Sequence, residues 1–129
     1  MRTAINAAII EHNKLLLVRK KSTWILPGGK PEIGENDLEC LCREIDEELS
    51  GTKIKDICFY NLFEDETPHK RDILRAKIYF ANIDGKLYSV RQGDSISEAQ
   101  WANNFSKYHL SKITYKVVNS LRQDKYIQF

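Results

Sequence analysis

The stretch WILPGGKPEIGENDLECLCREIDEELSG, residues 24–51, decides the architecture that this sequence predicts. It begins with a short apolar segment that stops at a proline and two glycines. Adjacent glycines allow backbone conformations closed to other residues, so a tight turn is expected at Gly28 and Gly29. A helix is predicted over residues 35–50, because apolar side chains recur there at helical spacing: Leu38, Leu41, Cys42, Ile45 and Leu49. Gly51 suits the left-handed position that ends many helices.

The segments on either side of this stretch alternate between strand-like and polar pieces. A turn joins the first two strands, and the polar stretch 64–72 separates two later ones. Mixed strands with two helices around one core predict an α/β or α+β sandwich. In chain order the predicted elements are strands 4–10, 14–19, 24–26, 54–63, 73–83 and 99–102, with helices 35–50 and 110–125.

Length, charge and cysteine content narrow the class of protein. The 129 residues fit a single domain, 1–129, and leave little room for a second. The formal charge of +2 is nearly balanced, so neither nucleic acid nor a membrane is expected as a partner. The longest apolar run, residues 15–18, is far shorter than the roughly 20 residues that span a bilayer. Three cysteines without a visible secretory signal indicate a reducing compartment, and a cytoplasmic location is expected.

The C-terminal half of the predicted helix carries Glu44, Glu47 and Glu48 on one side, flanking the apolar stripe. Like charges one turn apart destabilise a helix, and the helix dipole disfavours anions near the C-terminus. The arrangement therefore suggests that a cation compensates these carboxylates. Mg²⁺ is the natural candidate, because it takes oxygen ligands and only a few of them from protein. The alternative is an acidic face that is simply solvated.

Read continuously, this part of the sequence resembles the Nudix box. In that pattern a glycine is followed after five residues by Glu, and seven more lead to Arg-Glu, an aliphatic residue, any residue and Glu-Glu. The matching positions are Gly29, Glu35, Arg43, Glu44, Ile45, Glu47 and Glu48. The departure lies at the end, where Ser50 and Gly51 stand in place of a glycine and an aliphatic residue. Those two positions end the helix, so the departure concerns the backbone conformation after its last turn and not the expected metal ligands.

The resemblance implies an α/β/α sandwich with a mixed sheet between helices. It also implies hydrolysis of a nucleoside diphosphate linked to another group, with Mg²⁺ as the cofactor, Mn²⁺ as a substitute and a small nucleotide as the substrate. Carried onto this sequence, it makes Glu47, Glu48 and the Gly29 carbonyl metal ligands. Glu44 then either binds metal or accepts the proton of the attacking water. Arg43 is expected to orient the glutamates through charge-assisted hydrogen bonds.

Four candidate site residues lie outside the box, and each also has an ordinary structural interpretation. Glu98 stands in a stretch similar to a family segment whose acid adds a metal ligand or the general base; the alternative is a surface acid. Arg19, at a strand end, is a candidate phosphate ligand or a solvated strand end. His69 and Trp24 are candidate substrate-binding residues, against the alternatives of an exposed loop histidine and a core aromatic.

Markers outside the box separate the subgroups of the family. The proline expected in ADP-ribose hydrolases is not at the right spacing, since Pro68 lies too far along, and the tyrosine of dinucleoside polyphosphate hydrolases is absent. By exclusion the sequence resembles MutT-like nucleoside triphosphate pyrophosphohydrolases. The alternatives are an ADP-ribose or nucleotide-sugar pyrophosphatase and a binding module of this fold that does not cleave its ligand. A homodimer is compatible with the family.

Overall fold

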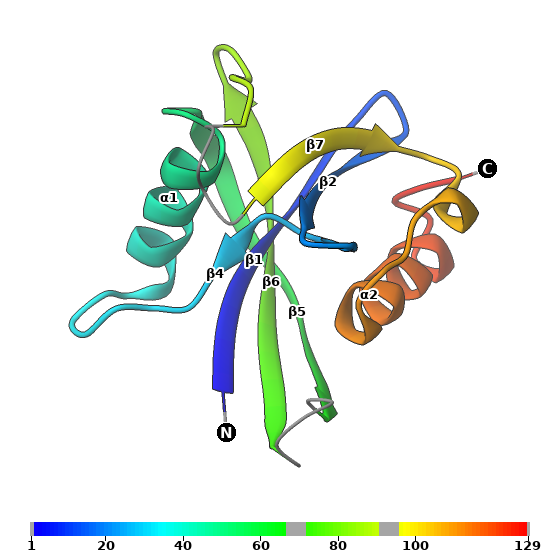
Figure 1. Ribbon diagram of the computed structural model, residues 1–129, viewed down its shortest axis with the longest axis horizontal. Coiled ribbons are helices and arrows are strands. Elements are labelled where there is room, and N and C mark those ends of the chain that lie inside the picture. The colour runs from blue at the N-terminus through cyan, green and yellow to red at the C-terminus, as the bar shows by residue number, and fades with distance from the viewer. Residues whose placement is uncertain (1, 67–71, 91–95, 129) are drawn as a thin grey trace.

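The computed structural model describes residues 2–66, 72–90 and 96–128. In these residues a mixed sheet lies between two helices, with α1 (Asp37–Glu48) on one face and α2 (Lys112–Gln123) on the other (Figure 1). The expected α/β/α sandwich is therefore confirmed. A short 3₁₀ turn, η1 (Phe105–Lys107), precedes α2 and was not predicted. Within the described ranges, neither helix is long and apolar enough to cross a membrane.

Each predicted strand is present, and most extend beyond their predicted ends. The strands are β1 (Arg2–Glu11), β2 (Lys14–Lys20), β3 (Thr23–Ile25), β4 (Gly28–Gly29), β5 (Lys53–Glu66), β6 (Ile73–Asp84) and β7 (Ile96–Ala102). The sequence places a polar connection over 64–72, yet β5 continues to Glu66, which pairs with Ile73. Backbone hydrogen bonds to β6 hold this end of β5, and they do not depend on the polarity of its side chains.

β1 connects the two halves of the sheet. It runs parallel to β6 from Arg2 opposite Leu74 to Ile9 opposite Ala81. Its last residues turn back into β2, which also pairs with β3 and β7. The short strand β4 pairs with the first half of β1, where Gly28 lies opposite Asn6. The glycine turn is thereby fixed against the centre of the fold.

The core consists of two apolar layers, one on each face of the sheet. Leu15 and Leu17 point into the layer beneath α2, whereas Leu16 and Val18 point into the layer beneath α1. Side chains alternate across a strand, so a strand covered on both faces needs apolar residues at every position. This explains the continuous apolar run at residues 15–18.

α1 begins later and buries a different set of side chains than the sequence predicted. Its N-cap is Asn36, whose side chain accepts from the Glu39 amide, while the Glu39 side chain accepts from the Asn36 amide. Cys40 is buried with Leu41, Ile45 and Leu49, but Cys42 and Leu38 are exposed, so the predicted stripe is wrong at those two positions. Cys40 and Cys42 lie about 200° apart around a helix, so both cannot face the sheet.

The end of α1 shows the conformation of Ser50 and Gly51, the two residues that depart from the Nudix box pattern. Both residues after the C-cap Leu49 adopt left-handed conformations, with φ of +51° at Ser50 and +90° at Gly51. The Gly51 amide donates to the Asp46 carbonyl at 2.8 Å and satisfies one of the free carbonyls of the last turn. The predicted left-handed Gly51 is confirmed. Ser50 adds a non-glycine residue in a conformation that is unfavourable for most side chains.

Candidate functional site

A cavity of about 500 Å³ lies where the glycine turn, α1 and the start of α2 meet. Its walls combine two carboxylates, two glycines and three cations: Glu44, Glu48, Gly28, Gly29, Arg2, Lys20 and Lys30. The rest of the lining is mainly aliphatic, with polar groups at Thr3, Asn6, Ser111 and Thr114. Acidic and basic side chains thus line the same cavity.

The glycine turn fits between β1 and α1 because neither residue carries a side chain. Gly28 has a φ of +138°, and a Cβ there would lie 2.1 Å from the Ile5 carbonyl oxygen. A Cβ on Gly29 would lie 2.5 Å from the carboxyl carbon of Glu44. The turn therefore presents bare backbone to α1, with a carboxylate directly over Gly29.

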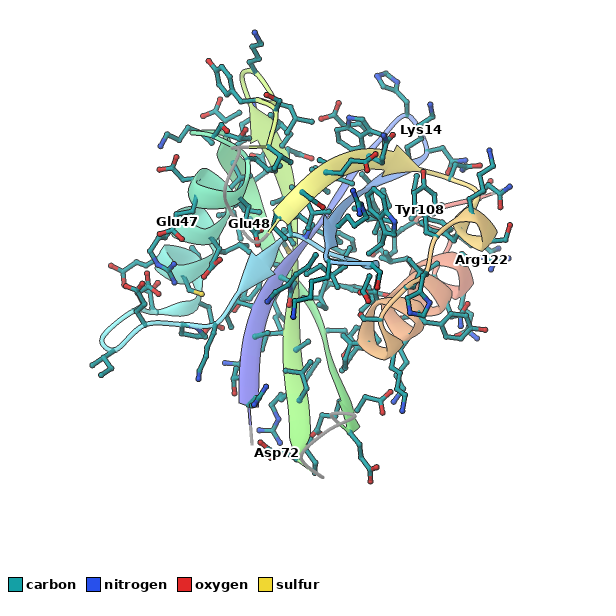
Figure 2. The ribbon with its side chains drawn as sticks, in the orientation of Figure 1. Lys14, Glu47, Glu48, Asp72, Tyr108 and Arg122 are labelled. Atoms are coloured by element: carbon teal, nitrogen blue, oxygen red, sulfur yellow. The ribbon has the colours of Figure 1, made fainter. Side chains whose placement is uncertain are left out.

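Glu48 reaches the same turn from the last turn of the helix. Its Oε1 accepts from the Gly28 amide at 2.9 Å, and Figure 2 shows the residue on the sheet side of α1. Burial raises the pKa of Glu48 to about 8, and it also raises the pKa of Glu44, which has a largely buried side chain. Both shifts mean that the surroundings do not fully compensate negative charge at this place.

Arg43 joins the loop before α1 to the glutamates on it. Its Nε and Nη2 bind the two oxygens of Glu35 at 2.6 and 2.9 Å, which lowers the pKa of Glu35 to about 2. Its Nη1 lies 3.0 Å from Glu44 and 3.3 Å from Glu47. Nη2 also donates to the Lys30 carbonyl at 3.2 Å. The guanidinium thus holds Glu44 in place and ties the loop to the helix.

The donor set suits a hard divalent cation that keeps water or substrate oxygen among its ligands. Glu44 and Glu48 lie one turn apart and both line the cavity. Glu47 is 56% exposed, lies on the outer side of α1 and pairs with Arg43 (Figure 2). The described residues contain no group of three Asp, Glu, His or Cys side chains already gathered for a metal. Mg²⁺ needs only one or two protein carboxylates beside phosphate oxygens, so the residues fit it.

Of the four candidates outside the box, three lie away from this cavity and the fourth lies outside the described residues. Arg19 and Glu98 face each other across β2 and β7, with an ion pair of 3.3 Å, and neither lines the cavity. Trp24 packs edge-on against Tyr108 with ring centroids 5.0 Å apart, in the layer beneath α2. His69 lies outside the described residues. The structure therefore brings the residues of the glycine turn and helix together, and it leaves Arg19, Glu98 and Trp24 apart from them.

The cations of the cavity were missed by the sequence analysis. Lys20 lines the cavity where Arg19 was expected, and the register of β2 against β7 shifts between these two residues. Lys30 directly follows the two glycines, and of the three cations it is the one whose position in the sequence indicated a place in the site. Arg2 enters the cavity only through the pairing of β1 with β6, which leaves no local pattern.

The comparisons with known proteins agree on one family. A sequence model of the NUDIX domain matches residues 1–104. The structure resembles a MutT NUDIX hydrolase from Burkholderia pseudomallei, with a TM-score of 0.76, 23% identity, and coverage of 92% of this chain and 95% of that one. It also resembles a MutT structure from work on Aliivibrio salmonicida and Vibrio cholerae (TM-score 0.73, 20% identity, coverage 99% and 98%).

A third similar structure holds a ligand. It is the NUDIX domain of NrtR from Shewanella oneidensis complexed with ADP-ribose, with a TM-score of 0.77, 17% identity, and coverage of 96% of this chain and 88% of that one. At these identities the solved structures establish the shared fold. The match of the domain model to most of the chain is what assigns the family.

The two glycines are predicted to respond differently to the same substitution. Gly28→Ala should lower the free energy of unfolding by about 2–3 kcal/mol, because the new Cβ meets the backbone of β1. Gly29→Ala should cost less than about 1 kcal/mol, because its Cβ meets only the movable end of Glu44. Urea denaturation measures both. Equal losses would contradict the different surroundings of the two residues.

The raised pKa of Glu48 predicts how the stability of the metal-free protein depends on pH. Between about pH 4.5 and 8 the folded state keeps a proton that the unfolded state releases, so stability falls as pH rises, by up to about 1.4 kcal/mol per pH unit. Glu48→Gln should reduce this decline, whereas Glu11→Gln, on an exposed strand end, should not. Denaturation in the presence of a chelator, repeated across this pH range, measures the decline in stability. Parallel profiles for Glu48→Gln and the wild type would disprove the prediction.

Proposed function

The chain belongs to the Nudix hydrolase family, and we propose that it hydrolyses a diphosphate linkage in a nucleoside diphosphate joined to another group, most specifically as a nucleoside triphosphate pyrophosphohydrolase of the MutT type. The observation that carries the proposal is the cavity, in which Glu44 and Glu48 meet the glycine turn beside Arg2, Lys20 and Lys30. A polyphosphate needs both a site for a cation and basic side chains for its free oxygens. This cavity provides both.

In the proposed reaction the basic residues act before water attacks, because the negative charge of a diphosphate repels an incoming nucleophile. Arg2, Lys20 and Lys30 attract phosphate oxygens into the cavity and reduce that charge. Glu48, Glu44 and the Gly29 carbonyl are proposed to hold Mg²⁺. Glu47 joins them if its exposed side chain turns away from Arg43. When bound, Mg²⁺ supplies charge neutralisation and Lewis acidity at the phosphoryl oxygens.

Glu44 is proposed as the group that accepts the proton of the attacking water. Its carboxylate lines the cavity with both oxygens close to the glycine turn, and Arg43 holds Oε1 at 3.0 Å. In the metal-free protein burial raises the pKa of this carboxyl group, so it takes up a proton more readily there than an exposed carboxylate does. Glu98 is placed less well for this role, because it pairs with Arg19 outside the cavity.

Metal-dependent turnover by the wild type tests the proposed reaction. The panel comprises nucleoside triphosphates, oxidised nucleotides, ADP-ribose, nucleotide sugars and dinucleoside polyphosphates, each with and without Mg²⁺. Release of nucleoside monophosphate and pyrophosphate from triphosphates is expected, and Glu48→Gln should reduce it at least roughly 100-fold. Glu11→Gln should match the wild type. Preferred cleavage of ADP-ribose or a nucleotide sugar would replace the MutT assignment, and no cleavage by folded protein would favour a binding module.

The two candidate bases are separated by their glutamine variants. Glu44→Gln should lower kcat by about 10²- to 10⁴-fold with little change in KM, because the substrate is held mainly by other groups. Glu98→Gln should leave kcat close to the wild-type value. Steady-state kinetics at saturating Mg²⁺ measures both. The reverse pattern would assign the base to Glu98.

A further inference from the structure

Asp37, the first residue of α1, makes a polar contact with the sheet. Its Oδ2 accepts from the Tyr79 hydroxyl at 2.6 Å and lies 3.3 Å from the Lys77 ammonium. Tyr79 and Lys77 are two positions apart on β6, so both point to the face that α1 covers. The helix start is already capped by Asn36 and Glu39. The Asp37 carboxylate is therefore not needed for capping and binds the sheet instead.

The C-terminal half of α1, which carries Glu44 and Glu48, must lie at a well-defined position over the glycine turn. The Glu44 carboxylate sits where a Cβ on Gly29 would lie only 2.5–2.7 Å away, and Glu48 receives a 2.9 Å hydrogen bond from Gly28. The apolar contacts of α1 with the sheet are not directional, so they resist separation better than sliding or rotation. A hydrogen bond is directional and fixes such movements.

We propose that Tyr79 is a positioning residue of this site, which acts through Asp37 to set the placement of α1 and hence of Glu44 and Glu48 over the glycine turn. The proposal rests on the proposed function, in which these glutamates hold a divalent cation. Lys77 supports the same contact through charge. Displacement of metal-site groups by even a fraction of an ångström weakens both metal affinity and turnover.

The chain offers a closely matched control on its other helix. Tyr60 on β5 donates to the carboxylate of Asp124, the C-cap of α2, at 2.6 Å, and its hydroxyl also lies 2.6 Å from the Ser120 hydroxyl on the same helix. The two tyrosines share the strand-to-helix geometry and the partner type, and burial raises the pKa of each to about 12. Of these two tyrosines, only Tyr79 contacts the helix that carries Glu44 and Glu48, which Lys77 and Lys53 also bind through Asp37 and Asp46.

The test compares Tyr79→Phe with Tyr60→Phe. Each variant removes one hydroxyl and keeps the ring, and Tyr79 also retains its edge contact with Phe59. Mg²⁺ and Mn²⁺ affinities are measured by calorimetry without substrate, together with melting temperature, kcat and KM. We expect both variants to melt lower. Tyr79→Phe alone should bind Mg²⁺ about tenfold more weakly and lose about tenfold in kcat, with little change in KM.

The outcomes separate this inference from the proposed function. Wild-type metal affinity and kcat in Tyr79→Phe, with a lowered melting temperature, would show a purely structural contact and overturn the inference alone. A wild type that neither binds Mg²⁺ nor cleaves any substrate would overturn both. If Tyr79→Phe does not fold, Asp37→Asn tests the same contact, since it weakens the acceptor and keeps the shape. Where all variants fold, the Tyr79→Phe and Asp37→Asn effects on metal affinity should be less than additive.

Discussion

Gly28 lies against the backbone of β1, which leaves no room for a side chain, and Gly29 lies under the carboxylate of Glu44, which would have to move to admit one. This close packing brings α1 near enough to the sheet for Glu48 to accept a hydrogen bond from the turn. It also draws two carboxylates into partly buried surroundings that raise their pKa values. The shape of the turn and the charge of the site therefore have one origin, and a bound cation would stabilise the charged form of both carboxylates.

Most of the fold was predictable from short-range patterns. Strands with one or two buried faces and helices with a buried stripe leave periodic signals in the sequence, and all the predicted elements formed. The errors arose where tertiary contacts override a pattern. Leu38 fits the apolar stripe, yet the first turn of α1 meets the sheet through Asp37, so Leu38 is exposed. The end of β5 is polar, but its partner strand holds it in the sheet.

The candidate site was predictable only in its contiguous part. The spacing of residues 29–48 places the glycine turn, Glu44 and Glu48 together, because a loop and a helix that follow each other have little freedom. Residues from distant strands depend on register, and an error of one position sends a side chain to the other face. That is why Lys20 lines the cavity while Arg19 pairs with Glu98. Nothing local marks Tyr79 either, since its partner lies on another element.

The parallel pairing of β1 with β6 has a consequence for how the chain is made. Arg2 lies opposite Leu74, so the partner of β1 leaves the ribosome only after the turn, α1 and β5 have all been synthesised. At roughly 5–20 residues per second, the edge of β1 that pairs with β6 stays open for several seconds, although β2 and β4, its other partners, are already made. Contacts this distant in sequence close late and slow folding. The strand that anchors the glycine turn is thus made well before its partner β6 and is among the last to be secured.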